Sequence, residues 1–140
     1  MVTSATMNAD TQPQRVILVD DSEYDNFFHD IALRKAGFGG EIQVFEKGDD
    51  ALKFLVEDQI DVPTIVLLDI NMPGLCGFEL AQELASRLQA KAPVAVYMLS
   101  ASSWGEDRKR AEKNELIQGM LSKPLTRESA QKLLGFAEHA

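Results

Sequence analysis

The chain has 140 residues, a length that fits one domain, and its composition is that of a globular protein, with 45% hydrophobic and 26% charged residues. Acidic residues outnumber Lys and Arg by 22 to 14, which gives a formal net charge of −8. This balance argues against binding to nucleic acid or to anionic membranes, because both need clustered basic residues. The single cysteine, Cys76, cannot form an internal disulfide, and no apolar run approaches the roughly 20 residues of a membrane-spanning helix, so we expect a cytoplasmic protein.

Residues 1–13 are small, polar and aperiodic, and we expect a flexible tail there, followed by one domain over residues 14–140. Short, mostly apolar runs in this domain are typical of strands that are covered on both faces: residues 15–19, 64–68 and 94–99. Residues 41–45 alternate apolar with polar side chains, which indicates a strand at a sheet edge. Residues 116–121 predict a weaker fifth strand.

Helical patterns fill the intervals between these runs. The first predicted helix has an apolar stripe with the spacing of one helix face: Tyr24, Phe27, Phe28 and Ile31. His29 lies beside or opposite this stripe and is expected at the surface. The second and third predicted helices end before Pro63 and Pro93. A fourth, very polar helix is expected over residues 105–113, and the fifth begins at Thr126, a favourable N-cap.

Strand and helix therefore alternate five times along the chain. Such alternation predicts an α/β domain, in which helices cover both faces of a doubly wound, five-stranded parallel sheet and form three layers, α/β/α. With residues 41–45 at an edge, the expected strand order is 2-1-3-4-5, as in flavodoxin-like folds.

Polar side chains directly follow four of the five predicted strands. Asp20 and Asp21 follow the first, Asp69 the third, Ser100 the fourth and Lys123 the fifth. Ligands of such sheets bind outside the carboxyl ends of the strands, so we expect these side chains in one crevice. Three carboxylates at close range raise one another's pKa values, and a hard divalent cation such as Mg²⁺ relieves this repulsion. The cation would also prepare a carboxylate to receive a phosphoryl group, whose oxygens Ser100 and Lys123 would hold.

The sequence resembles the receiver domain of two-component response regulators from about residue 15 to residue 140. The resemblance rests on four blocks: VDD at 19–21, LLDINMPGLCG at 67–77, LSAS at 99–102 and SKPLT at 122–126. It implies that Asp69 is the phosphorylated residue and that Ser100 is the switch hydroxyl, while Lys123 contacts the phosphoryl group. The resemblance also implies that Mg²⁺ or Mn²⁺ is bound by Asp69, by Asp21 directly, by Asp20 largely through water, and by the backbone carbonyl of Asn71. The peptide bond before Pro124 is typically cis in this family.

Two residues concern the switch and the partner surface. Met120 stands three residues before the lysine, where the family often has Phe or Tyr as the second half of the switch. Methionine is flexible enough to move between pockets, but it supplies neither a ring nor a hydroxyl. We expect Trp104 to pack on the fourth helix; the alternative is that it marks a partner surface or takes over the switching role.

The resemblance implies a stand-alone, chemotaxis-regulator-like signalling protein and not an enzyme. A histidine kinase or a phosphotransfer protein would phosphorylate Asp69 in a magnesium-dependent reaction. The phosphorylated form, as a monomer or a phosphorylation-dependent dimer, would bind a separate downstream protein or pass the phosphate on. Alone, the protein would at most accept phosphate weakly from small donors and hydrolyse it again.

Two alternative functions also fit parts of the sequence pattern. Met120 keeps open a phosphorylation-independent scaffold with a vestigial site. A phosphatase of the haloacid-dehalogenase type would also use a strand-end aspartate, Mg²⁺ and a lysine. That enzyme usually has a second aspartate two residues after the first, where this chain has Asn71, and its nucleophile normally follows the first strand and not the third.

Overall fold

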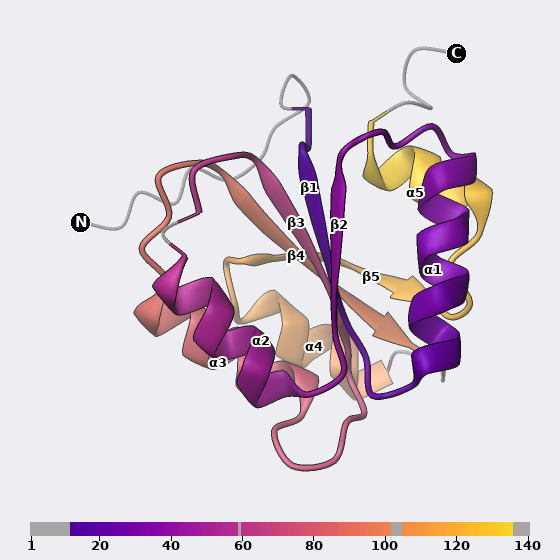
Figure 1. The fold of residues 1–140 in the computed structure, drawn as a ribbon. Helices are drawn as coiled ribbons and strands as arrows, with labels where there is room; N and C mark the ends of the chain where they lie inside the picture. Colours follow the sequence, from indigo (N-terminus) through magenta and orange to yellow (C-terminus); the bar gives the residue numbers. More distant parts are fainter. Residues whose placement is uncertain (1–11, 59, 102–104, 136–140) are drawn as a thin grey trace.

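The computed structural model describes residues 12–58, 60–101 and 105–135. Within these residues, five parallel strands form one sheet in the order β2-β1-β3-β4-β5 (Figure 1). The strands are β1 (Arg15–Val19), β2 (Glu41–Phe45), β3 (Thr64–Asp69), β4 (Val94–Ser100) and β5 (Ile117–Ser122). The predicted fold class and strand order are thereby confirmed, and β5 begins one residue later than expected.

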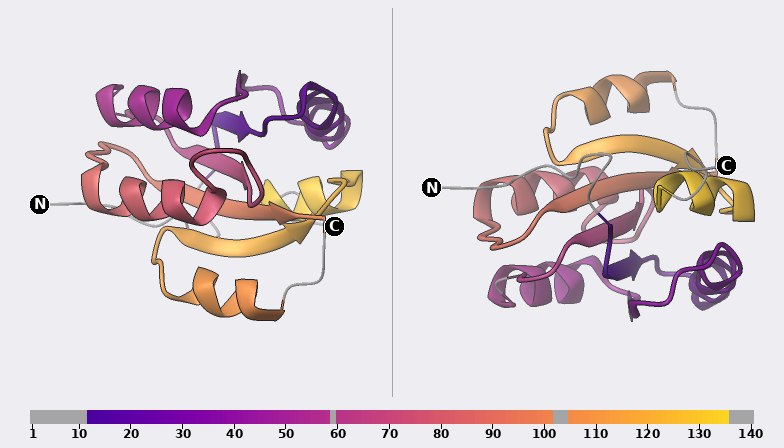
Figure 2. Two further views of the ribbon diagram at one scale, coloured as in Figure 1. Left: turned by 90° about the horizontal axis from the view of Figure 1, so that it is seen from below. Right: turned by 90° about the horizontal axis from the view of Figure 1, so that it is seen from above.

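Helices cover both faces of the sheet (Figure 2). They are α1 (Glu23–Lys35), α2 (Gly48–Glu57), α3 (Gly77–Arg87), α4 (Gly105–Glu112) and α5 (Arg127–Leu133). One hydrophobic core lies under α2, α3 and α4, and the other lies under α1 and α5. Strand β1 serves both cores, because successive side chains of a strand point to opposite faces: Ile17 packs into the first and Leu18 into the second.

The three inner strands are buried as their apolar composition predicted, whereas β2 at the sheet edge is half-exposed. No helix in the described part of the chain is long and apolar enough to span a membrane. Most of the expected tail, residues 1–13, lies outside the described residues.

Helix α1 differs from its prediction, because its aromatic residues face solvent. Tyr24, Phe27 and Phe28 are 74%, 61% and 49% exposed. The buried face consists of other residues: Asn26, His29, Ala32 and Leu33. The predicted apolar stripe was therefore wrong, and so was the surface position of His29.

Polar contacts at the start of α1 explain this rotation. Ser22 caps the helix, with its hydroxyl accepting a hydrogen bond from the backbone N–H of Asp25. The side-chain amide of Asn26, 3% exposed, donates to the backbone carbonyl of Asp20 at 2.9 Å. These two contacts turn the polar side of the first helical turn inward, and the aromatic side chains then lie outside.

Candidate functional site

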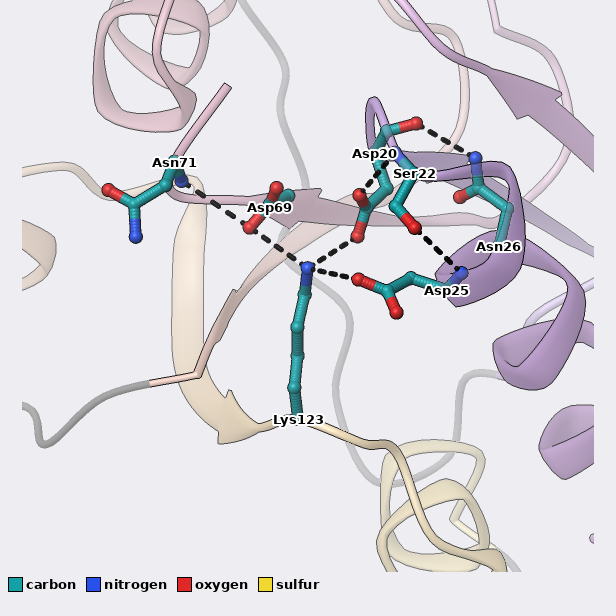
Figure 3. Close-up of polar contacts among 7 residues, drawn as sticks. All are labelled: Asp20, Ser22, Asp25, Asn26, Asp69, Asn71 and Lys123. Atoms are coloured by element: carbon teal, nitrogen blue, oxygen red, sulfur yellow. Dashed lines mark hydrogen bonds and ion pairs between the residues drawn. The ribbon is translucent and has the colours of Figure 1, made fainter. Parts of the chain in front are cut away.

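The polar residues predicted at the strand ends meet at the carboxyl edge of the sheet. Asp20 follows β1, Asp69 ends β3, and Lys123 follows β5. The extended side chain of Lys123 points between the carboxylates of Asp20, Asp25 and Asp69 (Figure 3). This convergence follows from the parallel register, which places the ends of neighbouring strands at one level.

The ammonium of Lys123 has three carboxylate neighbours. Its Nζ lies 2.7 Å from Oδ2 of Asp20, 2.9 Å from Oδ2 of Asp25 and 3.2 Å from Oδ1 of Asp69. Burial lowers the pKa of Lys123, but the contacts with Asp20 and Asp25 outweigh burial and leave this pKa above its ordinary value. The lysine therefore stays charged at every physiological pH.

Asp69 is a buried carboxylate whose polar contacts only partly offset the cost of burying its charge. Its Oδ1 accepts a hydrogen bond of 3.3 Å from the backbone N–H of Asn71 and contacts Lys123. Burial, followed by repulsion from Asp20, raises the pKa of Asp69 from 3.8 to about 6, although Lys123 opposes the shift. At neutral pH Asp69 is therefore mostly ionised and able to act as a nucleophile.

The carboxylates of Asp20, Asp21 and Asp69 fit a hard divalent cation. Each offers one oxygen, and these oxygens lie within 4.8 Å of one another. Oδ1 of Asp20 accepts a hydrogen bond from Ser22, but the buried Oδ2 receives none from the described residues and has only its ion pair with Lys123. An all-oxygen donor set with one exposed member, Asp21, suits Mg²⁺, which binds few carboxylates and retains water.

The loop after β3 is packed tightly against Asp69. Gly77 donates its backbone N–H to the carbonyl of Ile70, and a Cβ at Gly77 would collide with the backbone carbonyl of Asp69. Gly74, with φ of 81°, occupies the left-handed region that favours glycine. Asn71, the predicted carbonyl ligand, lies in this loop next to Asp69.

The ends of β4 and β5 complete the crevice. Ser100 is 1% exposed and is the last residue of β4. Its backbone carbonyl accepts a hydrogen bond of 2.9 Å from the N–H of Lys123. The following Lys123–Pro124 peptide bond is cis, the conformation that the sequence resemblance implied.

Met120 is half-buried in β5 and packs against the core under α2, α3 and α4. The ring on the adjacent strand, Tyr97, packs into the opposite core, so it does not stand in for the family's aromatic residue. Trp104, the other residue considered for switching, lies outside the described residues. The sequence analysis missed Asp25, whose only local signal is its place in the first turn of a helix that begins beside the crevice.

A flavodoxin-like sheet with an acidic crevice and one lysine at its carboxyl edge defines a class of α/β signalling domain. The family model of the response regulator receiver domain matches residues 16–134. The chain therefore belongs to the response regulator receiver domain family of two-component systems, as its sequence motifs indicated. Members of this family are signalling proteins that interact with histidine kinases or phosphotransfer proteins.

Similar proteins include both short and long chains. The probable methanogenesis regulatory protein FilR2 of Methanothrix harundinacea is 28% identical over 86% of this chain and 78% of its own length. The autoinducer 1 sensor kinase/phosphatase LuxN of Vibrio campbellii is 26% identical over 89% of this chain, which spans only 13% of that kinase. A two-component response regulator from Cytophaga hutchinsonii has a similar structure, with a TM-score of 0.78 and 29% identity over 93% of this chain and 99% of that one.

Proposed function

We propose that Asp69 accepts a phosphoryl group from a histidine kinase or a phosphotransfer protein in a reaction that requires Mg²⁺ or Mn²⁺. The observation that carries this proposal is the position of Asp69, which is in contact with the Lys123 ammonium and within the three-carboxylate cluster. The phosphorylated form then binds a separate protein or passes the phosphoryl group on. Because a histidine kinase takes its phosphoryl group from ATP, we also propose that the protein acts in the cytoplasm.

The transfer would proceed by attack of a carboxylate oxygen of Asp69 on phosphorus. The new O–P bond makes an acyl phosphate, while the P–N bond to the donor histidine breaks and its electron pair stays with the leaving imidazole. Lys123 stabilises the negative charge that gathers on the phosphoryl oxygens, and the Ser100 hydroxyl would hold one of them. Asp20, Asp21 and Asp69 would hold a divalent cation, which would supply further neutralisation of this charge.

The test is incorporation of radiolabelled phosphate from acetyl phosphate and from candidate kinases, with Mg²⁺ or with EDTA. Asp69→Asn should take no label, and EDTA should abolish labelling of the wild type. Asp50→Asn, which changes an exposed acid of α2, is the matched control and should be labelled like the wild type. Equal labelling of Asp69→Asn and the wild type would overturn the proposal.

A further inference from the structure

Asp25 is a third carboxylate at the ammonium of Lys123 that neither the sequence motifs nor the metal cluster includes. Its Oδ2 accepts a hydrogen bond of 2.9 Å from Nζ, across 98 positions of the sequence. The contact of Nζ with Asp25 is longer than its contact with Asp20, at 2.7 Å, and shorter than its contact with Asp69, at 3.2 Å. Asp25 is itself fixed in the first turn of α1, where its backbone N–H donates to the Ser22 hydroxyl.

Under the proposed function, the other two carboxylates around Nζ, those of Asp20 and Asp69, each have a further role. Asp20 belongs to the cluster that fits a divalent cation, and Asp69 would become an acyl phosphate. Asp25 belongs to neither group of ligands. When a cation is bound at Asp20 and a phosphoryl group is attached to Asp69, the carboxylate of Asp25 is still available to accept a hydrogen bond from the ammonium.

We propose that Asp25 is a positioning residue, which keeps Nζ of Lys123 directed into the crevice while the phosphoryl group is transferred to Asp69. This inference rests on the proposed function. The lysine side chain is flexible and has rotamer freedom to lose, so a fixed acceptor lowers the cost of placing its charge.

The charge of Asp25 also has an effect that opposes phosphorylation. Asp25 also adds a negative charge near an incoming anion, and its removal would favour anion binding. The side chain of Asp25 is 39% exposed, so solvent screens this repulsion. The hydrogen bond depends on direct contact and is less affected by solvent, so we expect positioning to dominate.

The experiment measures the rate of phosphorylation by acetyl phosphate at saturating Mg²⁺ in the full chain. Asp25→Ala should react about three- to tenfold more slowly, as expected for loss of one partly exposed charged hydrogen bond. Asp25→Glu should recover most of the rate. The matched control is Asp30→Ala, which removes the same charge from the same helix. It suits this purpose because Asp30 forms its ion pair with Arg34, at 3.7 Å.

A second measurement separates positioning from a general effect on the fold. In protein labelled with ¹⁵N-lysine, Lys123→Arg identifies the Nζ signal of Lys123. Its ammonium protons should exchange with water more slowly in the wild type and in Asp30→Ala than in Asp25→Ala, both with Mg²⁺ alone and with Mg²⁺ and beryllium fluoride. A purely structural role would lower the melting temperature of Asp25→Ala without changing this exchange.

The outcomes are distinguishable. If the wild type accepts phosphate and Asp25→Ala reacts as fast or faster, the positioning role is overturned and the proposed function stands. If the wild type accepts no phosphate from any donor, the proposed function is overturned and the role of Asp25 in transfer is overturned with it. Slower reaction and faster ammonium exchange in Asp25→Ala alone would support the proposal.

Discussion

The side chain of Asn26 is hydrogen-bonded to the backbone of Asp20, so the first turn of α1 is tied to the loop that carries two of the three clustered carboxylates. The bond is buried and 2.9 Å long. Helix α1 and the acidic crevice therefore form one unit, and a change in the phase of the helix would move the carboxylates.

Replacement of Asn26 should test this connection. We expect Asn26→Ala to lower the free energy of unfolding by about 1 kcal/mol, because a buried hydrogen bond is lost. The loss stays this small because the variant also removes Oδ1 of Asn26, which has no hydrogen-bond partner among the described residues. The same variant should bind Mg²⁺ more weakly, since Asp20 loses a support. Urea denaturation and a magnesium titration measure the two effects, and an unchanged midpoint together with unchanged affinity would contradict the connection.

Neutralising Asp69 should stabilise the metal-free protein at neutral and alkaline pH. The folded state raises the pKa of this carboxyl from 3.8 to about 6, so its contribution to stability is complete below pH 3.8 and is lost as the pH rises through 6. Asp69→Asn removes the charge but leaves Lys123 paired with Asp20 and Asp25. In EDTA at pH 8, where Asp69 is fully ionised in both states, we expect this variant to be more stable than the wild type by up to about 3 kcal/mol.

The pH profile supplies the control for that prediction. The difference in free energy of unfolding between Asp69→Asn and the wild type, measured by urea denaturation, should be smallest near pH 4 and largest above pH 7. A constant difference between Asp69→Asn and the wild type over this range would show that titration of Asp69 is not the cause.

Magnesium should stabilise the wild type through Asp21. Because Asp21 is exposed, Asp21→Asn should leave the metal-free melting temperature nearly unchanged while removing most of the gain that Mg²⁺ gives. At a concentration 100 times the dissociation constant, that gain is about 2.7 kcal/mol. Glu23→Gln, an exposed acid outside the cluster, is the control and should retain the full magnesium effect.

Gly77 should tolerate no side chain. A Cβ there meets the backbone carbonyl of Asp69 and the Cα of Ile70, so Gly77→Ala should lower stability by about 1–3 kcal/mol and slow phosphorylation by displacing Asp69. A Cβ at Gly39 meets nothing within 4 Å, which makes Gly39→Ala the matched control. Equal melting temperatures for the two variants would contradict the predicted collision.

The sequence predicted the sheet and most of the candidate site for one physical reason. Continuous apolar runs indicate strands with two covered faces, and parallel strands bring the residues after them to a single edge. Asp20, Asp69 and Lys123 could therefore be brought together without a structure, although they are far apart in sequence. The binding of Mg²⁺ by the three carboxylates remains a prediction from the strand-end residues. The Asn71 carbonyl as a ligand and the switch role of Ser100 remain predictions of the family resemblance.

Two features could not be predicted from local patterns. The spacing of Tyr24, Phe27 and Phe28 fits one helix face, but hydrogen bonds of Ser22 and Asn26 set the phase of α1 and turn these rings outward. Asp25 reaches a partner 98 positions away, and no periodicity within α1 carries that information.

The crowding of carboxylates around Lys123 affects the order in which the divalent cation and the phosphate donor bind. Asp20, Asp25 and Asp69 contact the Lys123 ammonium, and Asp21 joins Asp20 and Asp69 in the carboxylate cluster. With all four aspartates ionised and one lysine charged, these groups carry three more negative charges than positive ones. An anionic phosphate donor is repelled by such a field, whereas a divalent cation is attracted and leaves a single excess negative charge. Electrostatics alone therefore favours binding of the cation before the donor. We expect the rate of phosphorylation of Asp69 to depend on the supply of divalent metal for this reason.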